Sequence, residues 1–222
     1  MVLIFRYTSA KMYVIDSVRR VVRTWLKQLA KFLDHISGGR ITPNQVTIFS
    51  TLAHGLVAWA IIAGRLELAA GGLVVFGLMD AFDGELARLQ NRQSHLGIVL
   101  DATADRIKET LIYAAIVVYL ANLHSPLALY WVVFALGISI SLSYIKAKGE
   151  AVLASQTDIK LDPQTLNRFT GGSVLMQFDV RMAVIVAALL LDQLLAAAVI
   201  ISLGSVFAII SRYSELRHIL EK

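Results

Sequence analysis

Apolar residues occupy long runs of the chain, and short polar stretches separate them. Between Met12 and Leu33, apolar positions recur at helical spacing with Arg and Lys between them. The stretch from Gly38 to Asn44 then ends one helix and begins another, with Thr42 as candidate N-cap and Pro43 at the first helical position. A surface helix of a soluble domain would show the same spacing. The apolar sequence that follows favours an amphipathic helix at a membrane interface.

Six apolar segments after residue 40 are each long enough to cross a hydrocarbon core of about 30 Å. They run approximately over residues 43–63, 66–89, 96–120, 127–145, 173–191 and 194–210. We therefore predict an all-α integral membrane protein, with six transmembrane helices preceded by an N-terminal amphipathic interfacial helix. Residues 1–39 would form the juxtamembrane helix and residues 40–222 the transmembrane domain, without an internal repeat.

The distribution of positive charge predicts one orientation. Of 21 Lys and Arg residues, the three loops opposite the termini contain Arg65 alone. Because Lys and Arg concentrate on the cytoplasmic side, we expect both termini in the cytoplasm and the protein in the cell membrane. We expect no cleaved secretory signal. The net charge of +5 comes without an aromatic-basic recognition pattern, which indicates anionic lipid as a partner and no nucleic acid.

Composition agrees with a membrane protein and leaves the chemistry to residues other than cysteine. Hydrophobic residues make up 57% of the chain and charged residues 17%, and cysteine is absent. Disulfides and thiolate catalysis are therefore excluded. Three histidines inside the apolar part (His54, His95 and His124) lack ligand spacing, so we expect structural or interfacial roles for them.

Four aspartates lie near the cytoplasmic ends of the second and third predicted spans: Asp80, Asp83, Asp101 and Asp105. A carboxylate at membrane depth costs roughly 2.5–3.5 kcal/mol, so the cluster needs cations. Arg88 and Arg106 supply some positive charge, and metal would supply more. The first two aspartates are three residues apart and the last two are four apart, so each pair shares a helix face. Oxygen ligands of this kind suit Mg²⁺ or Mn²⁺.

The residues around these aspartates resemble a known family. Asp80 to Arg88 reads D-A-F-D-G-E-L-A-R, and Gly97, Asp101 and Asp105 follow at fixed intervals. This is similar to the complete motif of the CDP-alcohol phosphotransferases, D-x2-D-G-x2-A-R-x8-G-x3-D-x3-D, at all eight fixed positions. The hydropathy pattern extends the resemblance over residues 40–213. The resemblance implies a six-helix membrane enzyme, usually a homodimer, that cleaves CDP-diacylglycerol or CDP-archaeol.

The resemblance also implies roles for individual residues. Asp80, Asp83 and Asp101 would hold two metal ions and the nucleotide diphosphate. Asp105 would be the general base that accepts the proton of the acceptor hydroxyl, and would also contact metal. The hydroxyl would attack the lipid-side phosphorus, and CMP would leave. The residues expected to bind the CDP-lipid are Gly84, Ala87, Arg88, Asn44 and Thr47.

A second resemblance concerns the acceptor. Ser143 to Glu150 is similar to a segment of bacterial phosphatidylinositol phosphate synthases, as is Gly97 to Arg106. It implies inositol 1-phosphate as the acceptor, and the residues expected to bind its phosphate are Lys146, Lys148, Arg181 and Arg212. The chain departs from this subgroup at Lys148, which replaces an arginine, and at Phe178, where the subgroup tends to carry one. Cytoplasmic anchoring of these cations, and pairing of Arg181 with Asp179, are the alternatives.

The sequence is also compatible with another acceptor and with two other classes of membrane protein. Glycerol 3-phosphate is the nearest rival acceptor. Intramembrane aspartates also occur in cation-coupled transporters and in membrane prenyltransferases, although the D-G-x2-A-R element favours a nucleotide-lipid site over both. We expect Glu85 and Glu109 to be solvated or paired helix-end charges. The N-terminal helix would bind anionic lipid or contribute to a dimer.

Overall fold

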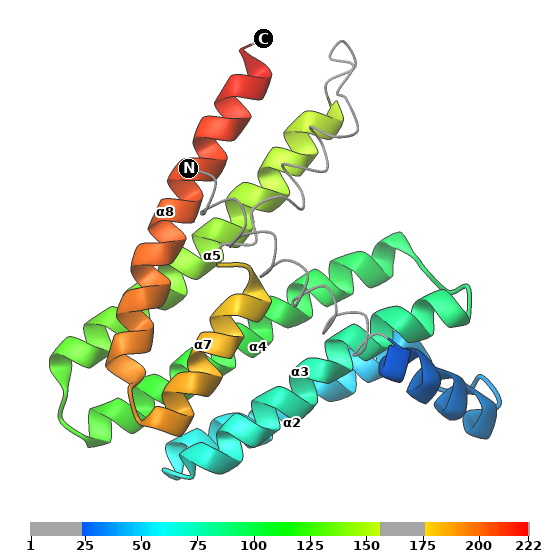
Figure 1. Cartoon of the computed structure of the whole chain (residues 1–222), viewed down its shortest axis with the longest axis horizontal. Coiled ribbons are helices and arrows are strands. Elements are labelled where there is room, and N and C mark those ends of the chain that lie inside the picture. The colour runs from blue at the N-terminus through cyan, green and yellow to red at the C-terminus, as the bar shows by residue number, and fades with distance from the viewer. Residues whose placement is uncertain (1–23, 156–175, 222) are drawn as a thin grey trace, which may run out of the picture. The chain divides into compact units, whose positions relative to one another are not determined.

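The chain folds into α-helices throughout the two ranges that the structure describes. The computed structural model describes residues 24–155 and 176–221, and these contain helices and turns but no strand. A helix at residues 24–37 precedes α2 (Pro43–Ile62), α3 (Leu66–Leu89), α4 (His95–Asn122), α5 (Pro126–Ser155), α7 (Phe178–Leu191) and α8 (Leu194–Leu220) (Figure 1). The prediction of an all-α protein is confirmed.

Helix ends agree with the sequence pattern where turn residues mark them. Gly64 follows α2 at a φ of 71°, and Asp192 caps α7 in the left-handed conformation at a φ of 53°. Two other helices run further than predicted, because α5 continues past residue 145 to Ser155 and α8 past residue 210 to Leu220. The apolar runs end there, but Ala, Leu, Glu, Lys and Arg continue, and all of these are good helix formers.

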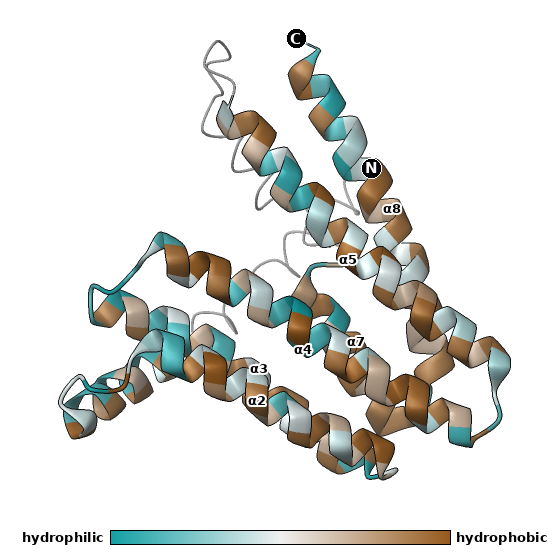
Figure 2. Ribbon diagram, turned by 180° about the vertical axis from the view of Figure 1, so that it is seen from behind, coloured by the Kyte–Doolittle hydropathy of each residue, from teal (hydrophilic) through white to brown (hydrophobic). Residues whose placement is uncertain are grey.

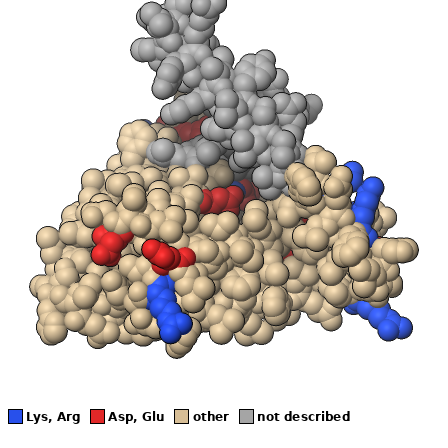
Figure 3. Space-filling view, turned by 60° about the horizontal axis from the view of Figure 1, so that its bottom comes forward, with Lys and Arg blue, Asp and Glu red and all other residues tan. Residues whose placement is uncertain are grey.

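Among the described residues, three helices are long and apolar enough to cross a membrane. They are α2, α5 and α8, whose best windows have mean hydropathies of 1.5, 1.9 and 2.5. Hydrophobic residues, brown in Figure 2, make up much of the length of these helices, a pattern typical of membrane spans. The face drawn in Figure 3 carries few charged side chains over its described part. Six spans remain a prediction, because α3 and α4 carry more charge and the described α7 has 14 residues.

One compact unit contains residues 24–52 and 75–104 of the described chain. Its core is formed by Ala30, Phe82 and Leu86 together with Val46. Ala30 and Leu86 are both fully buried, so the helix at 24–37 packs directly against the part of α3 that carries the first two aspartates. The helix that was predicted to lie at the membrane interface therefore also packs against α3, which carries Asp80 and Asp83.

The helix at 24–37 carries apolar residues on two faces. Leu26 and Leu33 pack beside Ala30 against the core, whereas Trp25 and Phe32 are 70% and 62% exposed. The apolar positions thus occupy two sides of this helix, one on the protein and one outside. The predicted residues from Met12 to position 23 lie outside the described part.

The second compact unit contains residues 53–74, 105–155 and 176–221 of the described chain. Within it α5 and α8 pack side by side, and α7 packs on α8 (Figure 1). Leu142, Met176 and Ala208 form a buried cluster between these elements. Gly204 makes room for this cluster, because a Cβ at position 204 would overlap the Met176 side chain.

Candidate active site

The first pair of aspartates is held by hydroxyl groups of the neighbouring helix. Ser50 Oγ on α2 lies 3.1 Å from Asp80 Oδ1, and Thr47 Oγ1 donates to Asp83 Oδ2 across 2.5 Å. Both carboxylates therefore lie on the side of α3 that faces α2, as their spacing predicts. Asp83 is 6% exposed. Each carboxylate has about four lone-pair sites, so accepting one hydroxyl is compatible with coordinating an ion.

The role of these hydroxyls was missed by the sequence analysis. Thr47 was assigned to the CDP-lipid, but it is buried, and its hydroxyl hydrogen-bonds to Asp83. Ser50 was not singled out at all, although its position one turn after Thr47 on α2 places both hydroxyls on the same side of the helix. Small hydroxyl residues one turn apart on the span before an aspartate pair are the signal that could have identified them.

The start of α4 lies close to the start of α2. Ser94 Oγ accepts a hydrogen bond from the Gly97 backbone N–H at 3.0 Å and so caps α4. A Cβ at Gly97 would lie 3.1 Å from Ser94 Oγ and 3.5 Å from Asn44 Oδ1. The motif glycine therefore allows a close approach here, and Asn44 itself is exposed.

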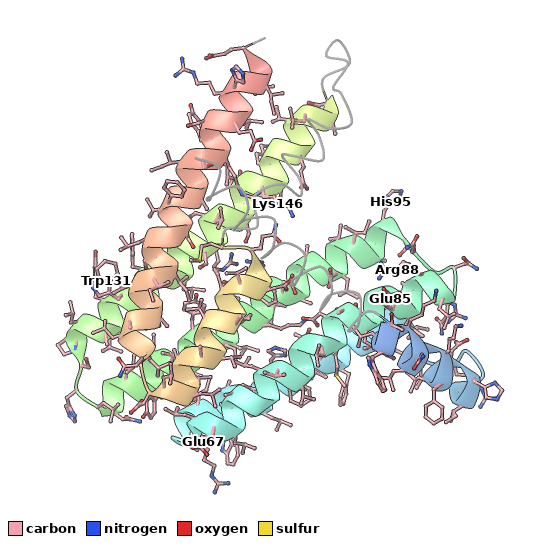
Figure 4. The ribbon with its side chains drawn as sticks, viewed as in Figure 1. Glu67, Glu85, Arg88, His95, Trp131 and Lys146 are labelled. Carbon is pink, nitrogen blue, oxygen red and sulfur yellow. The ribbon has the colours of Figure 1, made fainter. Side chains whose placement is uncertain are left out.

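Arg88 lies over the motif glycine of α3. A Cβ at Gly84 would meet both terminal nitrogens of Arg88, at 3.7 and 3.8 Å. Arg88 Nη2 pairs with Glu85 Oε1 at 2.8 Å, and 45% of the Arg88 side chain is exposed. Figure 4 shows the two side chains together on α3. The expectation that Glu85 is paired is confirmed, and Arg88 remains accessible to an anion.

The second pair of aspartates lies on α4, where Asp101 is exposed and Asp105 is partly buried. Two cations approach the latter carboxylate: Lys108 Nζ is 3.7 Å from Asp105 Oδ1, and Arg106 Nη2 is 4.0 Å from Asp105 Oδ2. Lys108 is fully buried. The carboxylate of Asp105 therefore has two basic side chains within 4.0 Å.

One turn further along α4, a buried ion cluster joins three helices. Glu109 accepts hydrogen bonds from Arg181 Nε at 2.7 Å and from Arg181 Nη2 at 2.9 Å, and pairs also with Arg106 Nη1. Arg106 Nη1 donates in addition to Ser143 Oγ at 2.6 Å, and its guanidinium lies 5.3 Å from the centre of the Phe178 ring. Glu109 is 0% exposed and Arg181 1%.

This cluster corrects two expectations. Glu109 is paired, as expected, but it lies inside α4 and is fully buried, so it is not a helix-end charge. Arg181 pairs with Glu109 and not with Asp179, which is exposed. Residues two apart on a helix face different sides, so Asp179 lies on another face of α7.

The remaining acceptor candidates differ in exposure. Arg212 is 2% exposed, and its charged neighbours are Glu150, Glu215 and Arg181. Lys146 is half-buried and projects from α5 in Figure 4, whereas Lys148 is exposed. The structure thus brings Arg181 and Arg212 together and leaves Lys148 at the surface.

The candidate metal ligands are all carboxylates. Across residues 24–155 and 176–221, no three Asp, Glu or His side chains are grouped closely enough to hold an ion. The candidates instead form two pairs, Asp80 with Asp83 and Asp101 with Asp105, each one helical turn long. Carboxylate oxygens are the ligands that Mg²⁺ and Mn²⁺ prefer, so the donor set fits, and the metal roles stay a prediction.

Membrane-length apolar helices and two carboxylate pairs define an α-helical membrane protein with a polar site. The family model for CDP-alcohol phosphatidyltransferase matches residues 40–210. The chain belongs to the CDP-alcohol phosphatidyltransferase family. The predicted family, and with it the predicted class of enzyme, is therefore confirmed.

One similar protein has a name that specifies its reaction more closely than the family does. The chain is 37% identical over 115 residues to the phosphatidylinositol phosphate synthase of Corynebacterium glutamicum. The aligned segment covers 50% of this chain and 52% of that protein. The matched part thus spans about half the length of this relative.

Solved structures show a similar fold. The phosphatidylinositol phosphate synthase of Mycobacterium tuberculosis with CDP-DAG bound has a TM-score of 0.67 at 22% identity, covering 86% of this chain and 92% of that one. The same synthase in complex with manganese and citrate has a TM-score of 0.65 at 24% identity, covering 86% and 88%. At these identities the likeness concerns the fold.

Proposed function

We propose that the protein transfers the phosphatidyl group of CDP-diacylglycerol to inositol 1-phosphate and releases CMP. The CDP-linked half of the reaction rests on family membership. The acceptor rests on the resemblance of Ser143 to Glu150 and on the named relative. The single observation that carries the proposal is the order of groups on α4, where Asp101, Asp105 and the cation-bound Glu109 follow one another at one-turn intervals.

Asp105 is proposed as the general base. It would accept the proton of the acceptor hydroxyl, whose oxygen then bonds to the lipid-side phosphorus while the bond from that phosphorus to the CMP oxygen breaks. Lys108, buried beside this carboxylate, would hold it in place for the acceptor hydroxyl. Arg88, exposed at its guanidinium, would bind the diphosphate through its planar fork.

Two divalent ions, Mg²⁺ or Mn²⁺, would be held by Asp80, Asp83, Asp101 and Asp105. When bound, such ions neutralise the charge that develops on a diphosphate. Thr47 and Ser50 would fix the orientation of the first two carboxylates through the hydrogen bonds described above. The manganese complex of the M. tuberculosis synthase supports this assignment.

The two substrates would be bound by different sets of residues. Gly84 and Ala87 would admit the nucleotide close to α3, and Asn44 would contact it from the start of α2. The acceptor phosphate would be bound by Arg181 and Arg212, with Lys146 and Lys148 as outer cations. CDP-archaeol is the alternative lipid, since its polar part is the same.

The membrane arrangement is proposed in the same way. Six spans would place both termini and the active site on the cytoplasmic side of the cell membrane, with residues 1–39 as a juxtamembrane helix and residues 40–222 as a homodimeric transmembrane domain. The exposed residues Trp25 and Phe32 beside Lys27 and Lys31 suit an interface with anionic lipid.

An acceptor panel tests the proposal. Purified full-length protein receives CDP-diacylglycerol, Mn²⁺ and one alcohol at a time, and CMP release is measured. We expect release with inositol 1-phosphate and none with inositol, and a parallel series with CDP-archaeol identifies the lipid. Lys148 and Phe178, which depart from the inositol phosphate subgroup, favour glycerol 3-phosphate as the second candidate. Absence of release with every phosphorylated alcohol would refute the proposed reaction.

A further inference from the structure

Two guanidinium groups share one carboxylate in the cluster around Glu109. Arg106 and Arg181 both bind the carboxylate of Glu109. The two side chains carry more N–H donors than one carboxylate accepts, and guanidinium groups bind phosphate oxygens well. The cluster is therefore suited to donate hydrogen bonds to an anion as well.

The two guanidinium groups of the cluster differ in accessibility. Arg181 is 1% exposed and donates through all three of its nitrogens, to Glu109 twice and to the Met176 carbonyl oxygen at 2.5 Å. A guanidinium has five N–H groups, so two N–H groups remain on Arg181. The side chain of Arg106 is 27% exposed. Arg181 therefore forms the inner part of the cluster and Arg106 its outer edge.

The outer guanidinium is fixed in direction by three contacts. Its Nη1 binds Glu109 and donates to Ser143 Oγ, and its plane lies against the Phe178 ring. These contacts point Nη2 toward Asp105, whose Oδ2 is 4.0 Å away. Phe178, where the similar subgroup tends to carry an arginine, thus supports Arg106 without adding charge. An aromatic ring face attracts a cation through the negative charge of its π-system.

We propose that Glu109 is a positioning residue for the phosphate of the acceptor, because it holds both Arg181 and Arg106, and Arg106 lies beside the carboxylate of Asp105. This inference rests on the proposed function and adds a residue that lies outside the family motif. Glu109 itself carries the same charge sign as phosphate and does not touch it. It acts by fixing two cations whose N–H groups meet the phosphate oxygens.

The test is a kinetic comparison of Glu109→Gln with wild type in the full-length protein. Gln keeps the shape of the side chain but removes its charge, so both arginines lose their fixed direction. We expect the KM for inositol 1-phosphate to rise about 10- to 100-fold, while the KM for CDP-diacylglycerol stays within about twofold. Inhibition by inorganic phosphate should weaken in parallel. Glu109→Asp, which keeps the charge, should recover part of the affinity.

Glu67→Gln is the matched control, because Glu67 is exposed in the first turn of α3 and is not part of the cluster. It should leave both KM values unchanged. An unchanged acceptor KM in Glu109→Gln, or an equal rise in both KM values together with a lower melting temperature, would overturn the inference in favour of a structural role.

Milder variants keep the test decisive should Glu109→Gln fail to fold. Ser143→Ala and Phe178→Leu each remove one contact of Arg106 and keep every charge. Each should raise the acceptor KM about threefold to tenfold, and no rise in either variant would contradict the inference. A wild-type protein that releases no CMP with any phosphorylated alcohol would instead refute the proposed reaction itself.

Discussion

Thr47 on α2 donates a hydrogen bond to Asp83 on α3 across 2.5 Å, and this bond orients a carboxylate of the family motif. The two residues are 36 positions apart, and both are buried. The contact explains why a hydroxyl residue stands at this position of α2: a buried carboxylate needs a donor to remain in one orientation.

Thr47→Val should weaken metal binding without unfolding the protein. Valine has nearly the same shape but no hydroxyl, so Asp83 loses its donor. We expect the Mn²⁺ concentration for half-maximal activity to rise about 10- to 100-fold, measured by CMP release in a metal titration. Thr51→Val is the control, because the Thr51 hydroxyl donates only to the backbone of its own helix, at the Thr47 carbonyl oxygen. Equal effects of the two variants would contradict the role of Thr47.

Asp105→Asn should abolish turnover and spare most of the CDP-lipid binding. Asparagine is nearly isosteric but cannot accept a proton from the acceptor hydroxyl. General base catalysis contributes about 10²- to 10⁴-fold, and we expect kcat to fall by that factor. Binding of CDP-diacylglycerol is measured separately. If Asp105 mainly held metal, the substitution would reduce lipid binding as strongly as it reduces kcat. Asp192→Asn, in the exposed left-handed cap of α7, should have no effect on either quantity.

Ala30→Leu should lower activity because the larger side chain displaces α3, while membrane attachment stays unchanged. Ala30 is 0% exposed against Phe82 and Leu86, and overpacking a core costs about 1–3 kcal/mol. We expect a lower melting temperature and a lower kcat, with the membrane-bound fraction unchanged in a flotation assay. Leu29→Ala, on the exposed side of the same helix, should leave kcat intact. Wild-type kcat in Ala30→Leu would show that the helix at 24–37 does not brace the motif.

Gly204→Ala should destabilise the packing of α8 against the start of α7. The new Cβ would overlap the Met176 side chain, and the carbonyl oxygen of Met176 accepts a hydrogen bond from Arg181. We expect a loss of about 1–3 kcal/mol, seen as a lower melting temperature with an accompanying rise in the acceptor KM. Gly137→Ala is the control, since nothing lies within 4 Å of its Cβ position. Gly137→Ala should stabilise the protein by about 0.5–1 kcal/mol, because alanine in the middle of a helix is favoured over glycine.

Local sequence was sufficient for the all-α class and for the family motif that contains the aspartates. Apolar run length, Pro43 and Gly64 predicted the bounds of α2, and the fixed spacing from Asp80 to Asp105 predicted the family. These features depend on residues close together in the chain, where helical periodicity alone decides which side chains share a face.

Contacts between residues that are distant in sequence could not be predicted from local patterns. Glu109 and Arg181 are 72 residues apart, and no pattern near either residue shows that they meet. The packing face of the helix at 24–37 was missed for a related reason, because its apolar residues occupy two sides and periodicity does not tell protein from lipid. The extension of α8 to Leu220 was missed because an apolar run measures membrane depth and not helix length.

The contrast between Arg181, sealed inside the helices, and Lys148, open at the surface of α5, has a practical consequence for redesign. Replacing Arg181 would leave the buried carboxylate of Glu109 without its two-point partner, whereas Lys148 can be exchanged at little structural cost. Efforts to retarget this scaffold to a bulkier or smaller sugar phosphate should therefore diversify the outer cations and keep the inner arginine constant.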